Sequence, residues 1–236
     1  QIVEQVARQF IAESKPEAAA HIATQLAARG AACSLDVLGE QVLSDEEAEW
    51  YARQYHQLLH ELAQAYEHLP AAQRPRACGP LISLSVKPSA LTPRFDSISP
   101  GRSLDRALQR LLPVLRVARE HAALVNLDME QYELRDLTLD LAKGILQHKD
   151  FGHGIALGVV IQAYLCDAET IAEDLLGWLG ERQRTLTIRL VKGAYWDYEV
   201  AHAAQRSWPA PVHLAKSDTD LAFERLTVRL LSASGQ

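Results

Sequence analysis

Ile155-Ala156-Leu157-Gly158-Val159-Val160-Ile161 is an uninterrupted apolar stretch, and it indicates how the chain folds. It has the length of a β-strand, and it lacks the alternation of apolar and polar residues found in strands that face water on one side. A strand of this composition is buried on both faces, which is typical of a parallel sheet covered by helices.

Segments of strand character and helical character alternate on both sides of this stretch. The other strand-like segments are residues 31–38, 81–87, 124–128 and 185–191. Apolar residues recur at helical spacing in residues 2–29 (read as two helices), 45–69, 104–121, 134–147, 170–180, 196–207 and 218–234. Gly30 marks a helix stop, and Ser44 with Glu47 three residues later marks a helix start. The alternation predicts an α/β protein with five strand–helix units.

Two architectures fit that alternation, a doubly wound sheet and a (β/α)₈ barrel of the TIM type. Doubly wound dinucleotide folds carry a glycine-rich turn after the first strand, where this chain has only Leu38-Gly39-Glu40. Polar residues at the strand ends favour the barrel, whose active sites lie there. Because a full barrel takes about 250 residues, five units predict an incomplete one. We expect an N-terminal helical segment at residues 1–30 and a C-terminally truncated barrel at residues 31–236.

Composition excludes some classes of function. The net charge is −6 and the basic residues are scattered, which argues against a nucleic-acid-binding protein. Three widely spaced cysteines form no metal or disulfide pattern and suggest a reduced, cytoplasmic compartment. No stretch approaches the roughly 20 apolar residues of a membrane span, so any contact with the inner membrane is expected to be peripheral.

Polar side chains gather where the predicted strands end. They are Asp36, Lys87, Asp128, Glu130, Gln162, Tyr164, Arg189, Lys192, Tyr195 and Trp196. In a barrel these side chains converge on one mouth. The set contains no histidine and does not suit a metal site. Elsewhere in the sequence, His56 and His60 have helical spacing but lack a third ligand. The set does suit a flavin and a small zwitterion, which need cations, hydrogen bonds and aromatic surface.

Several stretches resemble motifs of the proline dehydrogenase family. The most specific is Arg189-Leu190-Val191-Lys192-Gly193-Ala194-Tyr195-Trp196. Residues 36–40, 85–91, 126–132, 161–164 and 216–220 are similar to further family motifs in the same order, with Pro88 standing where the family usually has Leu. The stretch 128–132 is similar to that of a subset of bifunctional enzymes of the proline utilization A type, in which an aldehyde dehydrogenase domain follows the barrel.

The resemblance implies a barrel enzyme that oxidises L-proline to Δ1-pyrroline-5-carboxylate. FAD accepts the hydride in this family and passes electrons to a membrane quinone. The resemblance also implies two arginines that bind the substrate carboxylate and a His-Asn element for the flavin, all of which would follow Gln236.

Carried over by position, the resemblance assigns roles to individual residues. Asp128 and Arg189 correspond to the catalytic pair. Lys87, Ala194 and Tyr195 correspond to substrate-binding residues. The expected flavin contacts are Gln162, Arg189, Val191, Lys192, Gly193, Ala194, Tyr195, Trp196, Lys216 and Thr219. No metal ligand is expected.

Structural roles are the alternatives for the same residues. Asp36 could equally cap a helix or pair with a nearby cation. Asp128 and Arg189 could form a structural ion pair in the barrel. A non-catalytic remnant or interaction module, lacking a complete flavin site, is the alternative function, and a flavin-free barrel enzyme acting on an amino acid is a further one.

Overall fold

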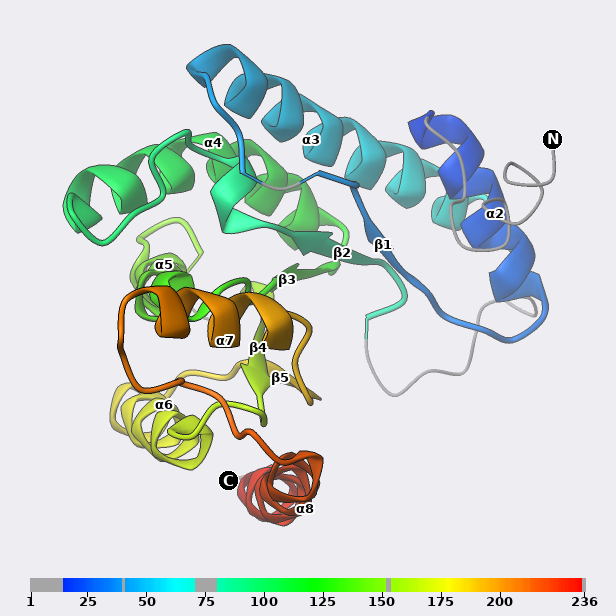
Figure 1. Cartoon of the computed structure of the whole chain (residues 1–236). Helices are drawn as coiled ribbons and strands as arrows, with labels where there is room; N and C mark the ends of the chain where they lie inside the picture. Colours follow the sequence, from blue (N-terminus) through cyan, green and yellow to red (C-terminus); the bar gives the residue numbers. More distant parts are fainter. Residues whose placement is uncertain (1–14, 40, 71–79, 152–153, 235–236) are drawn as a thin grey trace, which may run out of the picture.

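Five parallel strands form one sheet whose spatial order is the order of the chain (Figure 1). The computed structural model describes residues 15–39, 41–70, 80–151 and 154–234. The strands are β1 (Ser34–Asp36), β2 (Ser83–Val86), β3 (Leu124–Leu127), β4 (Ala156–Gln162) and β5 (Thr187–Val191). This order is the one expected of consecutive units in a barrel wall, so the prediction of parallel βα units is confirmed.

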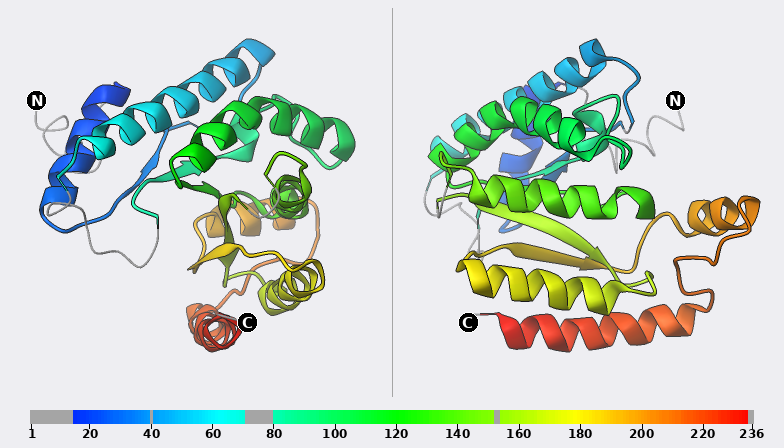
Figure 2. Two further views of the ribbon diagram at one scale, coloured as in Figure 1. Left: turned by 180° about the vertical axis from the view of Figure 1, so that it is seen from behind. Right: turned by 90° about the vertical axis from the view of Figure 1, so that its left-hand side faces the viewer.

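Seven α-helices and two short 3₁₀ turns lie in the described part of the chain. The helices are α2 (Pro16–Ala28), α3 (Asp45–Glu67), α4 (Pro100–Glu120), α5 (Arg135–Gln147), α6 (Ala168–Arg182), α7 (Trp196–Gln205) and α8 (Lys216–Ala233). The turns are η2 (Pro88–Ala90) and η3 (Tyr132–Leu134). Helices α3, α4, α5, α6 and α8 follow an arc around the outside of the sheet, whereas α7 lies beyond the strand ends (Figures 1 and 2).

The predicted helix ends are close to the observed ones. The Ser44 side chain accepts a hydrogen bond from the Glu47 N–H at 3.1 Å, as a capping residue does. Gly30 follows α2 with φ +83°, and its N–H donates to the Ala27 carbonyl. Helix α4 begins at Pro100 rather than Leu104, because proline fits the first helical position, where no N–H is needed. The helix expected before residue 15 lies outside the described residues.

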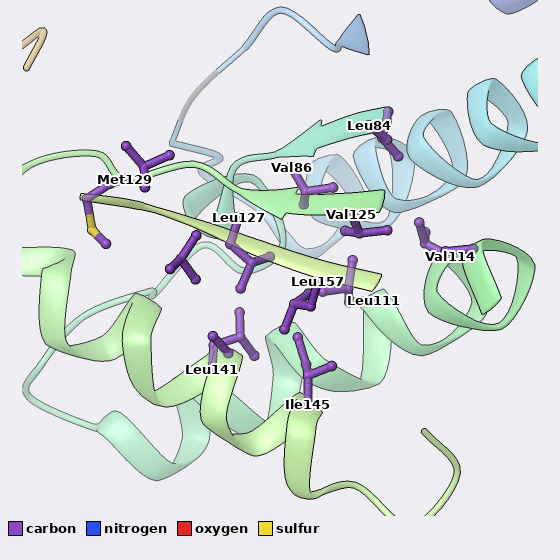
Figure 3. Close-up of a cluster of buried hydrophobic side chains, with 14 of the residues drawn as sticks. Leu84, Val86, Leu111, Val114, Val125, Leu127, Met129, Leu141, Ile145 and Leu157 are labelled. Atoms are coloured by element: carbon purple, nitrogen blue, oxygen red, sulfur yellow. The ribbon is translucent and has the colours of Figure 1, made fainter. Parts of the chain in front are cut away.

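The core lies between the sheet and the surrounding helices (Figure 3). Leu84, Val86, Val125 and Leu127 are fully buried on the helix-facing side of β2 and β3. They pack with apolar residues of α4 and α5, among them Leu111, Val114, Leu141 and Ile145. Because successive strand residues point to opposite faces, the residues between them, such as Ser85 and Asn126, face the other side of the sheet.

Helix α2 packs against α3 through buried alanines, among them Ala19 and Ala23, which belong to the same core cluster. The domain boundary at residue 30 stays a prediction. Among the helices that the structure describes, none is long and apolar enough to cross a membrane.

Candidate functional site

Strand register places the polar residues of the inner face in rows. Asp36 pairs with Ser85, Ser85 with Asn126, and Asn126 with Gly158 across β1 to β4. A Cβ on Gly158 would lie 2.7 Å from the Asn126 Oδ1, so glycine makes room for the amide. The next row on this face lies two residues further along each strand, toward the carboxyl ends, and contains Val160 paired with Arg189. The side chains predicted at the barrel mouth therefore share one face of the sheet.

Arg189 of β5 is held in place by one residue of β2 and one that follows β3. Its Nη1 donates to the Asp128 Oδ1 at 3.1 Å, and its Nη2 donates to the Ser85 Oγ at 3.1 Å. The Asn126 amide donates to the same Asp128 oxygen at 3.0 Å. Two bonds to two partners fix the plane of the guanidinium, which carries five N–H donors in all.

Lys87 is paired with Asp36 on the adjoining strand. The Lys87 Nζ lies 2.6 Å from the Asp36 Oδ2, and the lysine side chain is only 12% exposed. The Lys87 backbone N–H donates to the hydroxyl of the buried Tyr55 at 3.2 Å. The ammonium group thus lies at the mouth on an anchored backbone. Asp128 is bonded to Arg189, the pairing expected from the sequence, and the Lys87 ammonium bonds Asp36.

Burial affects the protonation of Asp128. Loss of water around its carboxyl group raises its pKa above the ordinary value, and the nearby Asp36 carboxylate raises it further. Lys87 and Arg189 act in the opposite direction without cancelling the effect. Asp128 is therefore a carboxylate that takes up a proton more readily than a carboxylate in water.

Two further polar residues of the predicted mouth, Gln162 and Glu130, differ in whether they line the pocket. Gln162 donates from Nε2 to the backbone carbonyls of Met129 and Glu130, both at 3.2 Å. Carbonyls only accept, so the amide oxygen must point elsewhere, and Gln162 lines the pocket described below. Glu130 is buried and accepts from the Ser89 N–H and hydroxyl instead. It does not line the pocket.

An open pocket of about 360 Å³ lies at the carboxyl ends of the strands. It is lined by Asp36, Lys87, Asp128, Met129, Val160, Gln162, Arg189, Val191, Lys192, Gly193, Ala194 and Tyr195. A larger hollow of about 790 Å³ lies between α3 and α4, and none of these residues lines it. The pocket brings together most of the residues predicted from the sequence.

Gly193 is required by the packing of the chain itself. Its φ is +133°, and a Cβ there would lie 2.5 Å from the ring of Tyr164. The Tyr164 N–H donates to the Lys192 carbonyl at 2.7 Å, which holds the two segments together. Close approach of backbone to Tyr164 therefore accounts for the glycine.

Trp196, Lys216 and Thr219 lie outside the pocket lining. The Trp196 indole N–H donates to the His213 carbonyl at 2.9 Å. Lys216 begins α8, whereas Thr219 is buried one turn later. Lys216 is nonetheless linked to the pocket, because Asp220 accepts from Lys192 at 2.5 Å and from Lys216 at 2.6 Å.

Three residues around the site were not assigned from the sequence. Ser85 holds Arg189, and Asp220 joins two lysines. Glu199 of α7 is buried and accepts a hydrogen bond from the Tyr132 N–H. Strand alternation could have identified Ser85, which is two residues before Lys87. Asp220 and Glu199 lie on helices whose sequence pattern resembles a solvated face.

Comparison with known proteins identifies the family. The family model described as proline dehydrogenase matches residues 19–236. The chain is 30% identical to the bifunctional protein PutA of Escherichia coli over 95% of this chain. It is 31% identical to proline dehydrogenase 1 of Bacillus subtilis over 97% of this chain. It spans 62% of the length of that Bacillus protein, and 17% and 16% of the PutA proteins of Klebsiella aerogenes and E. coli.

Solved structures agree with that assignment. The structure of proline utilization A from Bdellovibrio bacteriovorus, inactivated by N-propargylglycine, superimposes with a TM-score of 0.91 and 34% identity. That match covers 98% of this chain and 24% of the solved one. A mutant PutA from Bradyrhizobium japonicum gives a TM-score of 0.78 at 29% identity, covering 94% of this chain and 22% of that one. The five parallel strands therefore match a known barrel fold, and the chain belongs to the proline dehydrogenase family.

Proposed function

We propose that this chain forms the flavin- and substrate-binding part of an enzyme that oxidises L-proline to Δ1-pyrroline-5-carboxylate. The observation that carries the proposal is the pair of anchored cations, Lys87 and Arg189, that line one pocket with carboxylate partners behind them. Proline is a small zwitterion, so a site for it needs a cation for the carboxylate and room for the ring.

Lys87 is the proposed partner of the substrate carboxylate. An ammonium group has three donors, and Asp36 uses one of them at 2.6 Å. The side chain is mostly buried, so a second anion would meet it with little competition from water. Asp36 acts through Lys87 and is therefore a positioning residue, and Asp128 does the same for Arg189.

The residues present fit a flavin. The Oε1 of Gln162 is buried and has no hydrogen-bond partner among the described residues, so it can accept from an N–H of the ring. Arg189 could donate to the ring edge and stabilise negative charge there. Lys192 and Lys216, joined through Asp220, supply cations for the pyrophosphate. Trp196, at 40% exposure, offers an aromatic surface.

The cofactor supplies the redox chemistry when bound, because FAD can take up the hydride that leaves proline. The chain's own residues bind and orient. In this proposal Lys87 binds the substrate carboxylate and Arg189 binds the edge of the flavin ring. Tyr195 and Ala194, which also line the pocket, contact the substrate. Electrons then pass to a quinone at a membrane surface to which the protein attaches peripherally. A downstream aldehyde dehydrogenase domain, as in bifunctional relatives, would take the product further.

An absorbance spectrum of the purified full-length protein tests the proposal. We expect visible flavin bands that bleach when L-proline is added without oxygen. Bands that persist would leave a flavoprotein with another substrate. A folded protein without bands, even after FAD is supplied, would instead favour the non-catalytic remnant. Arg182→Lys, on the exposed end of α6, is the control variant that should bleach like the wild type.

A further inference from the structure

Helix α7 is the least embedded of the helices near the site. It projects beyond the carboxyl ends of the strands (Figure 2). Of its ten residues, only Glu199 and Ala203 are buried. Its N-cap is Tyr195, which lines the pocket, and its first residue is Trp196. The placement of two proposed ligand contacts therefore depends on how a projecting helix is held.

Glu199 makes a buried polar contact between α7 and the turn η3. Its Oε1 accepts from the Tyr132 backbone N–H at 2.7 Å, and the residue is 3% exposed. Tyr132 begins η3, directly before α5, so this contact ties α7 to the connection after β3. The same connection carries Met129 and Glu130, whose carbonyls hold Gln162. A short hydrogen bond to a buried carboxylate is stronger than one between neutral groups.

Glu199 is also coupled to the N-terminal turn of its own helix. Its N–H donates to the Tyr195 carbonyl at 2.9 Å, which is the first bond of α7. One residue therefore links the η3 backbone on one side with Tyr195 on the other. The indole of Trp196, bound to the His213 carbonyl, is the second point at which this turn is held.

We infer that Glu199 is a positioning residue, whose bond to the Tyr132 N–H docks α7 and thereby places Tyr195 at the ligand pocket and Trp196 directly after it. The inference rests on the proposed function for what the pocket binds, but the docking itself does not. The buried Ala203 and the partly buried Val200 are small side chains that present little apolar area to hold the helix. The carboxylate is therefore retained at a buried position that would otherwise favour an apolar side chain.

The surroundings of Glu199 make its bond sensitive to pH. Burial raises the pKa of Glu199, and the carboxylate of Glu133, which belongs to η3, raises it further. The Tyr132 N–H and His202 of α7 act in the opposite direction. Tyr164, after β4, also interacts with it, and its own pKa is raised by burial and by Glu199. A protonated carboxyl is a weaker acceptor, so the docking bond should weaken as pH falls through the raised pKa.

Hydrogen exchange on the protein without FAD tests the docking directly. Glu199→Ala should lower the protection factor of the Tyr132 amide by about tenfold or more. Asp197→Ala is the matched control, because it removes an exposed carboxylate from the same helical turn and should leave that factor unchanged. Glu199→Gln keeps an acceptor oxygen, so it should retain protection and lose the pH dependence of the wild type.

FAD titration then tests the consequence for the pocket. We expect Glu199→Ala to raise the Kd for FAD by about tenfold, with Asp197→Ala matching the wild type. Equal Tyr132 protection in the two alanine variants would overturn the inference, and so would equal Kd values. If Glu199→Ala does not fold, the wild type and Glu199→Gln are compared instead. A pH dependence of Tyr132 protection that the Gln variant loses supports the inference, and the same dependence in both proteins overturns it. A wild type that binds no FAD would defeat the proposed function and leave the exchange result standing.

Discussion

The two faces of strands β2 and β3 differ completely although their residues alternate along the same backbone. On the helix side, Leu84, Val86, Val125 and Leu127 are 0% exposed and purely apolar. On the other side, Ser85 and Asn126 are also buried, but they serve Arg189 and Asp128. Burial alone therefore does not distinguish core residues from site residues. What distinguishes them is whether their contacts are apolar or are hydrogen bonds to charged groups.

One strand can therefore contribute to stability with one face and to the ligand site with the other. A change on the helix side removes packing and leaves a cavity. A change on the inner side removes a hydrogen bond or a charge from an open pocket, where water can replace part of the loss. The two faces should respond to substitution in different observables.

The largest expected effect is on the helix side. Leu127→Ala should lower the free energy of unfolding by about 2–5 kcal/mol, because a fully buried leucine is truncated within the core of Figure 3. Chemical denaturation of the purified protein measures it. Val228→Ala on α8, where the side chain is 67% exposed, is the control that should change little. A loss below about 1 kcal/mol at Leu127 would break the distinction between the faces.

A change on the inner face should affect catalysis and spare stability. Arg189→Lys cannot reproduce the bonds to Asp128 and Ser85 together, because lysine lacks the planar fork. We expect kcat/KM for proline to fall about 100-fold, which corresponds to about 2.7 kcal/mol. The unfolding midpoint should stay close to the wild type, because the side chain is 37% exposed. Unchanged kinetics with a large loss of stability would reverse the assignment of this face.

The smallest expected effect is a pH dependence at Asp128. Its pKa is raised in the folded protein from 3.8, so the folded state binds more protons than the unfolded state just above that pH. Stability from this group therefore falls as pH rises through that window and levels off above the raised pKa. The Asp128→Asn variant has no carboxyl group at this position and should therefore lack this dependence of stability on pH.

Unfolding free energies of wild type and Asp128→Asn, measured from acid to neutral pH, test that slope. The stability of the variant relative to the wild type should rise with pH across the window. A difference that does not change with pH would mean that the carboxyl group titrates as it does in water.

Much of the fold and of the pocket was predictable from the sequence. Apolar strands flanked by amphipathic helices predicted the parallel sheet, and polar residues at the strand ends predicted the mouth. Family resemblance then selected Lys87, Asp128 and Arg189, which the structure brings to one pocket. Their roles remain proposals.

The partners of those residues were not predictable, because they depend on register and on loop direction. Lys87 and Asp128 follow the paired residues Val86 and Leu127, yet the Lys87 ammonium bonds Asp36 on β1, and Asp128 bonds Arg189 from β5. Glu130 lies two residues after Asp128, yet it points elsewhere because β3 ends at Leu127 and the chain turns. Glu199 looks like a solvated helix residue in the sequence, and only the docking of α7 buries it.

The strand order β1-β2-β3-β4-β5 has a consequence for how the molecule is made. Each of the strands β2 to β5 pairs with the strand synthesised immediately before it, so these four pairings do not wait for a segment that leaves the ribosome much later. Loop closure then involves one strand–helix unit at a time, which keeps its entropic cost low. Growth of this sheet can therefore keep pace with translation, and the edges that a chaperone would have to shield are those of β1 and of the strand most recently added.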